Sequence, residues 1–447
     1  MNWFLLVAIL FCFSVPLLAQ QGQTSGLQFV APMLIGGGQD SNFLANEPVP
    51  NAQPGEPTLK PVMLSDQFLL LTLPKIAYFN DTRRHAFSAT WVPEFEMYLH
   101  NSDLNQMNQQ AVVAFDYLLT RRMTISLGDA YLSTDDPSRT LQNVFLQLPL
   151  DRYRENAVRA SFEWQKSRLT AFEVRVDHSY TTYATDDTFQ GRSINERATG
   201  YTFSAARMVG RNQRLRGIYS LITMTALNQP QVIDGVVDPT EPFQQPVQAA
   251  TLQYRVGLNR GTTVEASGGV INLDTGLNYT FRGALDKRIA TYYTIAASFS
   301  RTLEFLSPTR TGFVQGLDSH GFYDVAVVRF NGQPSRKTAF YVDSTFARSA
   351  GSSVIDSRIQ ANRALSGRFR FDYRLNDRSV FFSSLESFHQ NRNQFVIAPL
   401  RRNRFTVGVE ISLATEVQRR TSRLNEDTRY VGISDHPKTI DDSGQEE

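Results

Sequence analysis

Cysteine is almost absent from this sequence. The 447 residues include a single cysteine, Cys12, which lies in an apolar amino-terminal segment that we expect to be removed on export. The mature chain would then contain no cysteine at all. This excludes a disulfide-stabilised scaffold, a thiolate metal site and a cysteine nucleophile.

The sequence also lacks long apolar runs and an excess of either charge. Beyond residue 19, no apolar stretch approaches the ~20 residues that a membrane-spanning helix requires. The formal net charge is +2, and arginine supplies nearly all of the positive charge because lysine is scarce. A balance so close to neutral argues against a nucleic-acid-binding protein. We therefore expect no nucleic acid among its partners.

The amino terminus has the pattern of an export signal. Residues 2–18 are mostly apolar, and the stretch ends at Ala19, a small residue of the kind that signal peptidases select. We predict a signal peptide over residues 1–19 with cleavage after Ala19. An uncleaved anchor or a chance apolar run is the alternative, because no lysine or arginine precedes the apolar core.

Alternation of apolar and polar residues dominates the rest of the chain. Residues 113–119, 277–282, 369–374 and 405–413 are clear examples, in which charged or hydroxyl side chains separate large apolar ones. A closed barrel in a membrane needs this pattern, because one face of each strand meets lipid and the other meets the lumen. The predicted fold class is all-β: a transmembrane antiparallel up-and-down β-barrel of about 16 strands over residues 85–414.

The predicted strands alternate with short and long connections. The approximate strand ranges are 86–100, 109–119, 123–133, 156–165, 169–183, 197–208, 213–226, 247–258, 261–272, 275–286, 289–303, 320–331, 336–348, 366–375, 379–390 and 402–414. Every second connection is short and rich in charge or turn formers, such as residues 120–122, whereas most others, such as residues 228–246, are long and polar. Short periplasmic turns and longer outer loops are typical of these barrels and predict that both chain ends lie in the periplasm. A soluble propeller or sandwich is the alternative.

The two ends of the chain differ from the predicted barrel. Residues 20–84 contain Gly36-Gly37-Gly38 and a proline-rich stretch, which favour neither a helix nor a strand ladder. We expect a flexible periplasmic leader here. A plug inside the lumen is the alternative, because the apolar residues 68–73 would dock on an apolar surface. Residues 415–447 are polar and are predicted to form a periplasmic tail.

The last predicted strand resembles the signal that outer-membrane barrels present to the barrel assembly machinery. Gly408, Ile411 and Leu413 match the glycine and the two apolar positions of that signal. In the superfamily, an aromatic residue usually closes both the motif and the chain. Here Leu413 takes that place and the polar tail follows.

A looser resemblance covers residues 86–413. Residues 96–105, 118–129 and 134–137 resemble the opening hairpins of a group of β-barrel porins, some of which belong to gene clusters for exopolysaccharide production. The resemblance implies a channel in the outer membrane of a Gram-negative bacterium and a link to exopolysaccharide export.

Charged residues on one strand face are candidates for lining the lumen. They are Glu94, Glu96, Asp116, Arg159, Glu163, Glu173, Arg175, Asp177, Arg255, Arg282, Asp343, Arg368, Arg370, Asp372, Arg374 and Glu410. A lumen of this size is too wide to be filled by its own wall, and rings of charge tune the selectivity of such a channel. The alternative is that these charges pair across neighbouring strands and only keep the lumen wet.

The segment from 367 to 376 carries the densest set of these candidates. Arg368, Arg370 and Arg374 share one face with Asp372, so three cations would form a ladder suited to anionic or hydroxylated sugars. Salt bridges to Glu410 or Asp343 are the alternative.

The histidines form no evident catalytic or metal-binding motif. Six are scattered along the chain with no pair at metal-ligand spacing, and a strand would place His178 on the face opposite Asp177 and Ser179. We predict no enzymatic activity, no cofactor and no metal. A hydrolase assembled at the outer rim around His100, His178 or His389 is the alternative.

Acidic pairs in two predicted outer loops raise the question of calcium. Asp135-Asp136 and Asp186-Asp187 would suit calcium between lipopolysaccharide phosphates, but the pattern favours solvated turn residues.

These features predict an outer-membrane channel for passive or weakly selective passage of small polar solutes or saccharides. A non-conducting barrel that acts as a scaffold or surface-interaction protein is the alternative. The expected partners are outer-membrane lipid, lipopolysaccharide, the barrel assembly machinery and a small solute or saccharide. No sequence feature identifies an oligomer interface.

Overall fold

The computed structural model of the chain describes residues 25–29, 33–41, 65–82, 84–102, 105–134, 152–184, 195–233, 236–259, 261–273, 276–305, 320–350, 363–391 and 400–412. The strands are β1 (Ser25–Phe29), β2 (Met33–Asp40), β3 (Asp66–Thr72), β4 (Ile76–Asp81), β5 (His85–Tyr98), β6 (Gln106–Thr120), β7 (Met123–Thr134), β8 (Arg152–Ser167), β9 (Thr170–Ala184), β10 (Asn195–Gly210), β11 (Gln213–Ile233), β12 (Val236–Asn259), β13 (Thr262–Leu273), β14 (Gly276–Ala290), β15 (Tyr293–Phe305), β16 (His320–Gly332), β17 (Thr338–Ala350), β18 (Arg363–Arg374), β19 (Ser379–Asn391) and β20 (Leu400–Ile411). In this part of the chain no helix has the length and apolar character needed to cross a membrane.

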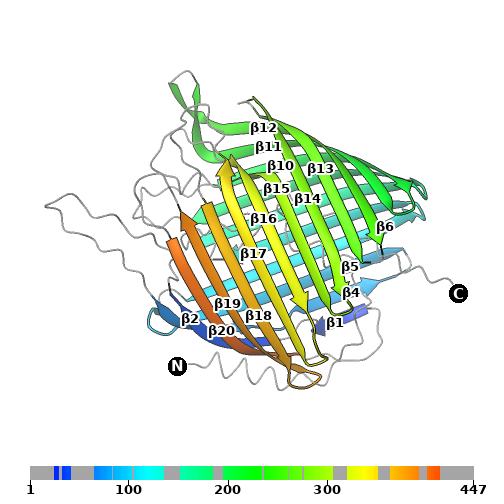
Figure 1. Cartoon of the computed structure of the whole chain (residues 1–447). Helices are drawn as coiled ribbons and strands as arrows, with labels where there is room; N and C mark the ends of the chain where they lie inside the picture. The colour runs from blue at the N-terminus through cyan, green and yellow to red at the C-terminus, as the bar shows by residue number, and fades with distance from the viewer. Residues whose placement is uncertain are drawn as a thin grey trace.

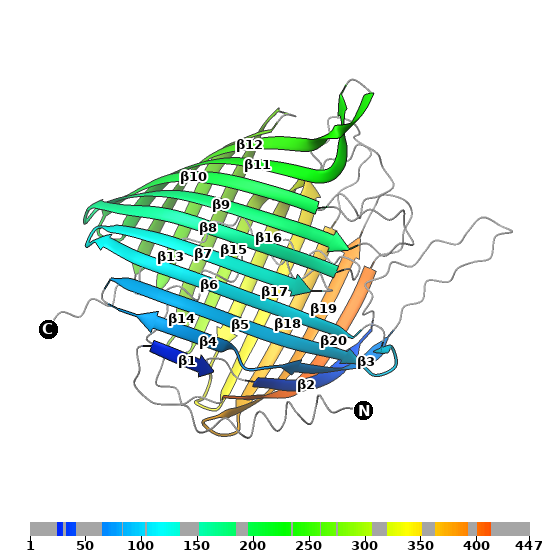
Figure 2. The same ribbon diagram turned by 180° about the vertical axis from the view of Figure 1, so that it is seen from behind.

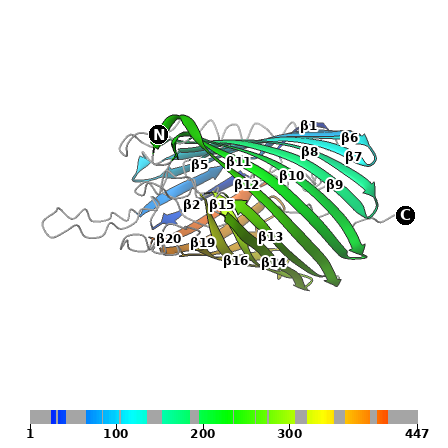
Figure 3. The ribbon, with the colours of Figure 1, turned by 90° about the horizontal axis from the view of Figure 1, so that it is seen from above.

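Eighteen of the strands form a closed antiparallel ring. Each strand from β5 to β20 pairs with the next one in sequence, and β2 and β3 complete the circle between β20 and β5. Figure 1 shows β20 beside β2, so strands from opposite ends of the chain lie side by side. Figure 2 shows the opposite wall, formed by β5 to β12, and Figure 3 shows the tilted strands from above.

The predicted barrel strands correspond one for one to β5 to β20. Their antiparallel pairing and the short turns that join every second pair confirm the up-and-down order. One predicted loop is wrong. The ladder between β11 and β12 continues to Ile233 and Val236, so strands and a short connection replace the long loop expected at residues 228–246. This extended hairpin projects beyond the barrel in Figures 1 and 2.

The structure corrects the expectation of a flexible leader or plug at residues 25–29, 33–40, 66–72 and 76–81. β3 and β4 pair with successive parts of β5 and behave as one interrupted strand. β2 and β1 pair with β3 and β4 in turn. The remaining leader residues, the predicted signal peptide and the polar tail lie outside the described residues.

Glycines explain how β2 closes against β20. Gly36 lies opposite Gly408, and a Cβ on Gly38 would lie 1.7 Å from the backbone oxygen of Phe405. The two backbones therefore approach more closely than side chains on this face would allow. The absence of a side chain at Gly38 leaves that part of β2 uncovered on the inner face.

Arg404 crosses the surface that these glycines leave open. From β20 it reaches over β2 and β3 to Glu96 of β5, where its Nη2 lies 2.9 Å from Oε2 of Glu96. On the way its guanidinium stacks 4.0 Å from the ring centre of Phe68. Tyr98 donates a hydrogen bond of 2.5 Å to the other oxygen of Glu96, a carboxylate that is only 1% exposed. One arginine of β20 therefore contacts both β3 and β5.

The outward face of the barrel is mostly apolar, and an ion pair between Arg301 and Asp324 is among its exceptions. Large side chains on this face remain exposed, including Leu127, Phe203, Leu252, Phe369 and Phe405 with exposed fractions of 46–56%. In each of these strands, the residues on either side of the apolar residue point to the opposite face, which carries the candidate lumen charges. An apolar surface around the whole ring is what contact with lipid requires.

The inward face changes character along the strands. In β16, Tyr323 and Val325 are buried near the end with the long connections, whereas Arg329 and Asn331 are exposed toward the short turns. The buried end belongs to an apolar cluster of Tyr323, Val325, Ala347, Ala364 and Phe388. A second cluster lies on β11 to β13 and includes Phe322 of β16. The long-connection end of the inner face is therefore shielded from water, and the short-turn end is open to it.

We expect removal of residues 20–84 to prevent barrel closure rather than to open a pore, because β20 and β5 would each lose a hydrogen-bonded neighbour. The shortened protein, refolded in detergent, should lose its cooperative melting transition by circular dichroism. A chain lacking residues 415–447 is the control and should melt as the full chain does. Equal melting of both shortened proteins would contradict the assignment of β2 and β3 to the wall.

We expect Gly38→Val to destabilise the barrel by at least ~1–3 kcal/mol, the usual cost of forcing extra carbons into a packed site. Its Cβ would clash with the backbone of Phe405, whereas a Cβ at Gly367 meets no atom within 4 Å. Gly367→Val is therefore the matched control, and denaturant unfolding in detergent compares the two. Similar stabilities of both variants would show that the close approach is not required.

Candidate functional site

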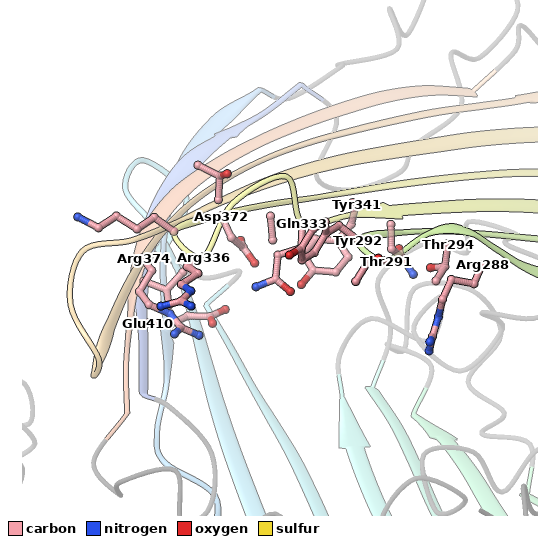
Figure 4. Close-up of a pocket in the computed structure, with 16 residues that line it drawn as sticks. Arg288, Thr291, Tyr292, Thr294, Gln333, Arg336, Tyr341, Asp372, Arg374 and Glu410 are labelled. Atoms are coloured by element: carbon pink, nitrogen blue, oxygen red, sulfur yellow. The ribbon is translucent and has the colours of Figure 1, made fainter. Parts of the chain in front are cut away.

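All sixteen predicted lumen residues lie on the same face of the ring. The cross-strand register connects Arg159 with Asp177 and Asp343 with Arg368, and it keeps the other candidates on that face around the wall. Figure 4 shows several inner-face residues on the side of the sheet that faces the opposite wall. The register therefore agrees with the shared face that the alternation predicts, and a pore-lining role for these residues stays a prediction.

Most of the predicted charges are held in ion pairs. The carboxylate of Asp177 accepts a hydrogen bond of 2.6 Å from Nε of Arg159 and one of 2.7 Å from Nε of Arg175. Glu173 pairs at 2.9 Å with Arg216, which also donates to the hydroxyl of Ser204. This part of the lumen matches the alternative in which neighbouring strands neutralise each other's charges.

The predicted arginine ladder on β18 is also largely paired. Arg368 lies 2.6 Å from Asp343, and Arg370 contacts Asp372 at 2.7 Å and Glu410 at 2.5 Å. The structure therefore favours the salt-bridge alternative at two of the three positions. Arg374 differs, since its side chain forms no ion pair within the described part of the chain and lines a pocket instead.

The remaining candidates have more varied surroundings. Glu94 accepts hydrogen bonds from Asn108 and Thr72. Arg282 lies 3.9 Å from Glu265, and Arg255 faces Arg214 and Glu265 across the ladders.

Two further acidic candidates have less favourable surroundings for a carboxylate. Glu163 lies directly opposite Glu173. One oxygen of Asp116 is buried and has no hydrogen-bond partner.

The most buried ion pair joins residues that the alternation did not single out. Arg402 of β20 donates to Asp40 of β2 at 2.6 and 2.9 Å, and the Asp40 side chain is fully buried. Asp40 lies at the end of a glycine-rich segment that has no side-chain alternation to reveal a strand. The basic run Arg401-Arg402 was the available signal, but its partner lies 362 residues away.

A pocket of about 450 Å³ opens on the inner face near the short turns. It is formed by the turn ends of β14 to β19 together with β20. The lining residues are Arg288, Thr291, Tyr292, Thr294, Asn331, Gly332, Gln333, Arg336, Lys337, Thr338, Ala339, Tyr341, Asp372, Arg374, Val380 and Glu410. Figure 4 shows Arg336 and Arg374 near Glu410, with Arg288 at the other side of the pocket.

The histidines named as rim candidates are not equivalent. The His100 Nδ1 lies 2.7 Å from buried Asp66, which also accepts hydrogen bonds from Asn101. His178 contacts Thr199 on the outward face, away from Asp177 as the strand alternation predicts. No serine, threonine or tyrosine hydroxyl contacts His100 in the described ranges, and the His100–Asp66 pair also fits a structural anchor for the end of β5.

The assembly-signal residues occupy the last described strand. Gly408 and Ile411 lie in β20 opposite Gly36 and Met33, whereas Leu413 lies outside the described residues. Recognition by the assembly machinery stays a prediction.

The described residues contain no group of three or more metal-ligating side chains. The acidic pairs at 135–136 and 186–187 lie outside them.

Comparisons with known proteins give no family. No protein-family model matches the chain, and no curated protein matches it. Among solved structures, the siderophore receptor PirA from Pseudomonas aeruginosa is similar at 9% identity and a TM-score of 0.42, over 86% of this chain and 81% of that one. A mutant ferric enterobactin receptor PfeA from the same organism is similar at 7% identity and a TM-score of 0.43, over 86% of this chain and 81% of that one. The FrpB iron transporter from Neisseria meningitidis is similar at 7% identity and a TM-score of 0.44, over 81% of this chain and 62% of that one. TM-scores below 0.5 support no functional assignment, and none of these three structures is an exopolysaccharide-associated porin.

We expect the buried and exposed ion pairs of the lumen to contribute unequally to stability. Asp40→Asn leaves Arg402 buried beside a neutral group and should cost ~3–5 kcal/mol. Arg368→Gln removes a pair whose arginine is 56% exposed and should cost no more than ~1 kcal/mol. Denaturant unfolding of both variants in detergent measures the difference, and equal losses would contradict it.

Proposed function

We propose that this protein is a channel in the outer membrane of a Gram-negative bacterium, through which small polar solutes pass. The single observation that carries the proposal is the division of one closed ring into an apolar outward face and a charged inward face. Closed barrels of 16–18 strands are wide enough to contain an aqueous channel. The ion-paired inner face would keep such a channel wet without giving it a strong preference for either charge.

The outward face supports the membrane location and the lipid partners. Exposed apolar patches of this extent are unfavourable in water. Toward the long connections, Arg348 and Arg363 lie directly opposite each other on the outward face, beyond Phe346 and Leu365. Opposed cations at this boundary would suit the phosphates of outer-membrane lipid or lipopolysaccharide.

A more specific proposal concerns the chemical class of the solute. Passage of saccharides, in connection with exopolysaccharide export, rests on the resemblance of the opening hairpins to a group of porins. The hydroxyl and amide groups of the inner face are compatible with a saccharide and equally with other polar solutes.

A specific observation favours a second function, a non-conducting barrel that acts as a scaffold or surface-interaction protein. The apolar clusters on the inner face are buried, with Val247 and Val325 only 1% and 3% exposed. A lumen open along its whole length would leave these side chains in water. In this second proposal the two clusters form an apolar constriction beside buried polar residues such as Thr345 and Gln390. Apolar constrictions close channels by excluding water.

We expect the refolded full chain to form steady pores in a planar bilayer, and the apolar constriction to limit their conductance. Val247→Thr with Val325→Thr adds hydroxyls at nearly constant volume and should raise conductance by about twofold or more, since a more polar constriction is more easily wetted. Single-channel recording measures this.

The control replaces two outward-facing valines, Val328→Thr with Val407→Thr, and should leave conductance unchanged. Silence from the full chain and from both variants would overturn the channel proposal and favour the scaffold.

A further inference from the structure

The pocket at the short-turn end of the lumen carries an unusual balance of charge. Its lining includes four cations, Arg288, Arg336, Lys337 and Arg374, all on exposed residues. None of them forms an ion pair with another residue of the described ranges. This contrasts with the arginines farther up the same wall, most of which have carboxylate partners.

The two carboxylates of the pocket do not compensate these cations. Asp372 and Glu410 both bind Arg370, at 2.7 and 2.5 Å. Arg370 is also held 4.7 Å from the ring centre of Phe382, which fixes its position between them. Because one arginine already engages both acids, the pocket keeps a net positive charge that a bound anion would neutralise.

The rest of the lining supplies neutral hydrogen-bonding groups. Tyr292, Tyr341 and Gln333 lie between the cations in Figure 4, together with Thr291 and Thr294. Hydroxyl and amide groups both donate and accept hydrogen bonds, so they suit a ligand that carries hydroxyls. The two tyrosines remain 60% and 39% exposed and leave ring faces available for contact.

We propose that this pocket binds a small hydroxylated anion, a sugar acid or a sugar phosphate, at the short-turn mouth of the lumen. The pocket volume of about 450 Å³ accommodates a molecule of this size. Binding at the mouth gives the channel a preference for anions that the paired charges deeper in the lumen do not supply. That role in passage rests on the proposed channel function, whereas binding itself does not.

The affinity is expected to be weak. Solvent-exposed cations each contribute little to binding, so dissociation constants of about a millimolar are expected. Weak binding suits a channel, because a solute must leave the site as readily as it enters.

Saturation-transfer NMR on the refolded full chain tests the proposal with gluconate, glucose 6-phosphate and neutral glucose. Gluconate, glucose 6-phosphate or both should bind in the millimolar range, and glucose should bind more weakly. The triple variant Arg336→Gln, Lys337→Gln and Arg374→Gln should weaken anion binding by about tenfold, since three modest charge contributions are lost.

The matched control removes the same number of exposed cations from other short turns at the same end: Arg121→Gln, Arg122→Gln and Arg211→Gln. It should change binding less than about twofold, since charges outside the pocket act only through screened solvent. Binding of gluconate alone identifies a carboxylate site, and binding of glucose 6-phosphate alone identifies a phosphate site.

The proposed anion site is contradicted if glucose binds as tightly as the anions. It is also contradicted if the control variant loses as much anion affinity as the pocket variant. Recordings of conductance on the same preparations separate the two proposals. Anion binding without conductance overturns the channel alone, whereas conductance without anion binding overturns the pocket alone.

Discussion

The ladder between β2 and β20 is the constraint on which the rest of the barrel depends. An unpaired sheet edge within a bilayer has no water to satisfy its backbone groups, so a ring that is open at one place is not viable there. This ladder has only the eight residues of β2, from Met33 to Asp40. Its side chains compensate for its length. The buried Asp40–Arg402 pair and the Arg404–Glu96 contact both cross it, and a shift by one residue would turn these charges toward the lipid face.

The same physical property explains which strands the sequence reveals. From β5 onward, side chains of opposite character alternate, and the pattern predicts both the strands and the face of each charged residue. In β2, Gly36, Gly37 and Gly38 have no side chains to alternate, although they are the residues that permit the close approach to β20. The glycine segment that closes the barrel therefore resembles a flexible segment in the sequence. The extended hairpin of β11 and β12 escapes prediction for another reason. Pro230 and Pro242 lie at an irregularity of the ladder, where proline is tolerated.

The ion-pair partner of a lumen charge is harder to predict than the face of the strand on which the charge lies. Alternation settles whether an arginine faces inward, but its partner depends on the stagger between strands and on the reach of a long side chain. Arg370 illustrates this, because it contacts Asp372 on its own strand and Glu410 two strands away. By engaging both acids it leaves Arg374, the next inward arginine, without a carboxylate partner in the described part of the chain. The pocket thus owes its charge to a pairing that is fixed elsewhere on the wall.

The distance along the chain between the two sides of the ladder has a consequence for assembly. Asp40 and Arg402 are separated by 362 residues, so nearly the whole barrel must be synthesised before this contact can form. Until then, β2 and the most recent strand are both free edges, and contacts of such large sequence separation form slowly. The arrangement acts as a test of completeness. A chain that ends before β20 retains two open edges, whereas a chain that includes β20 can pair both.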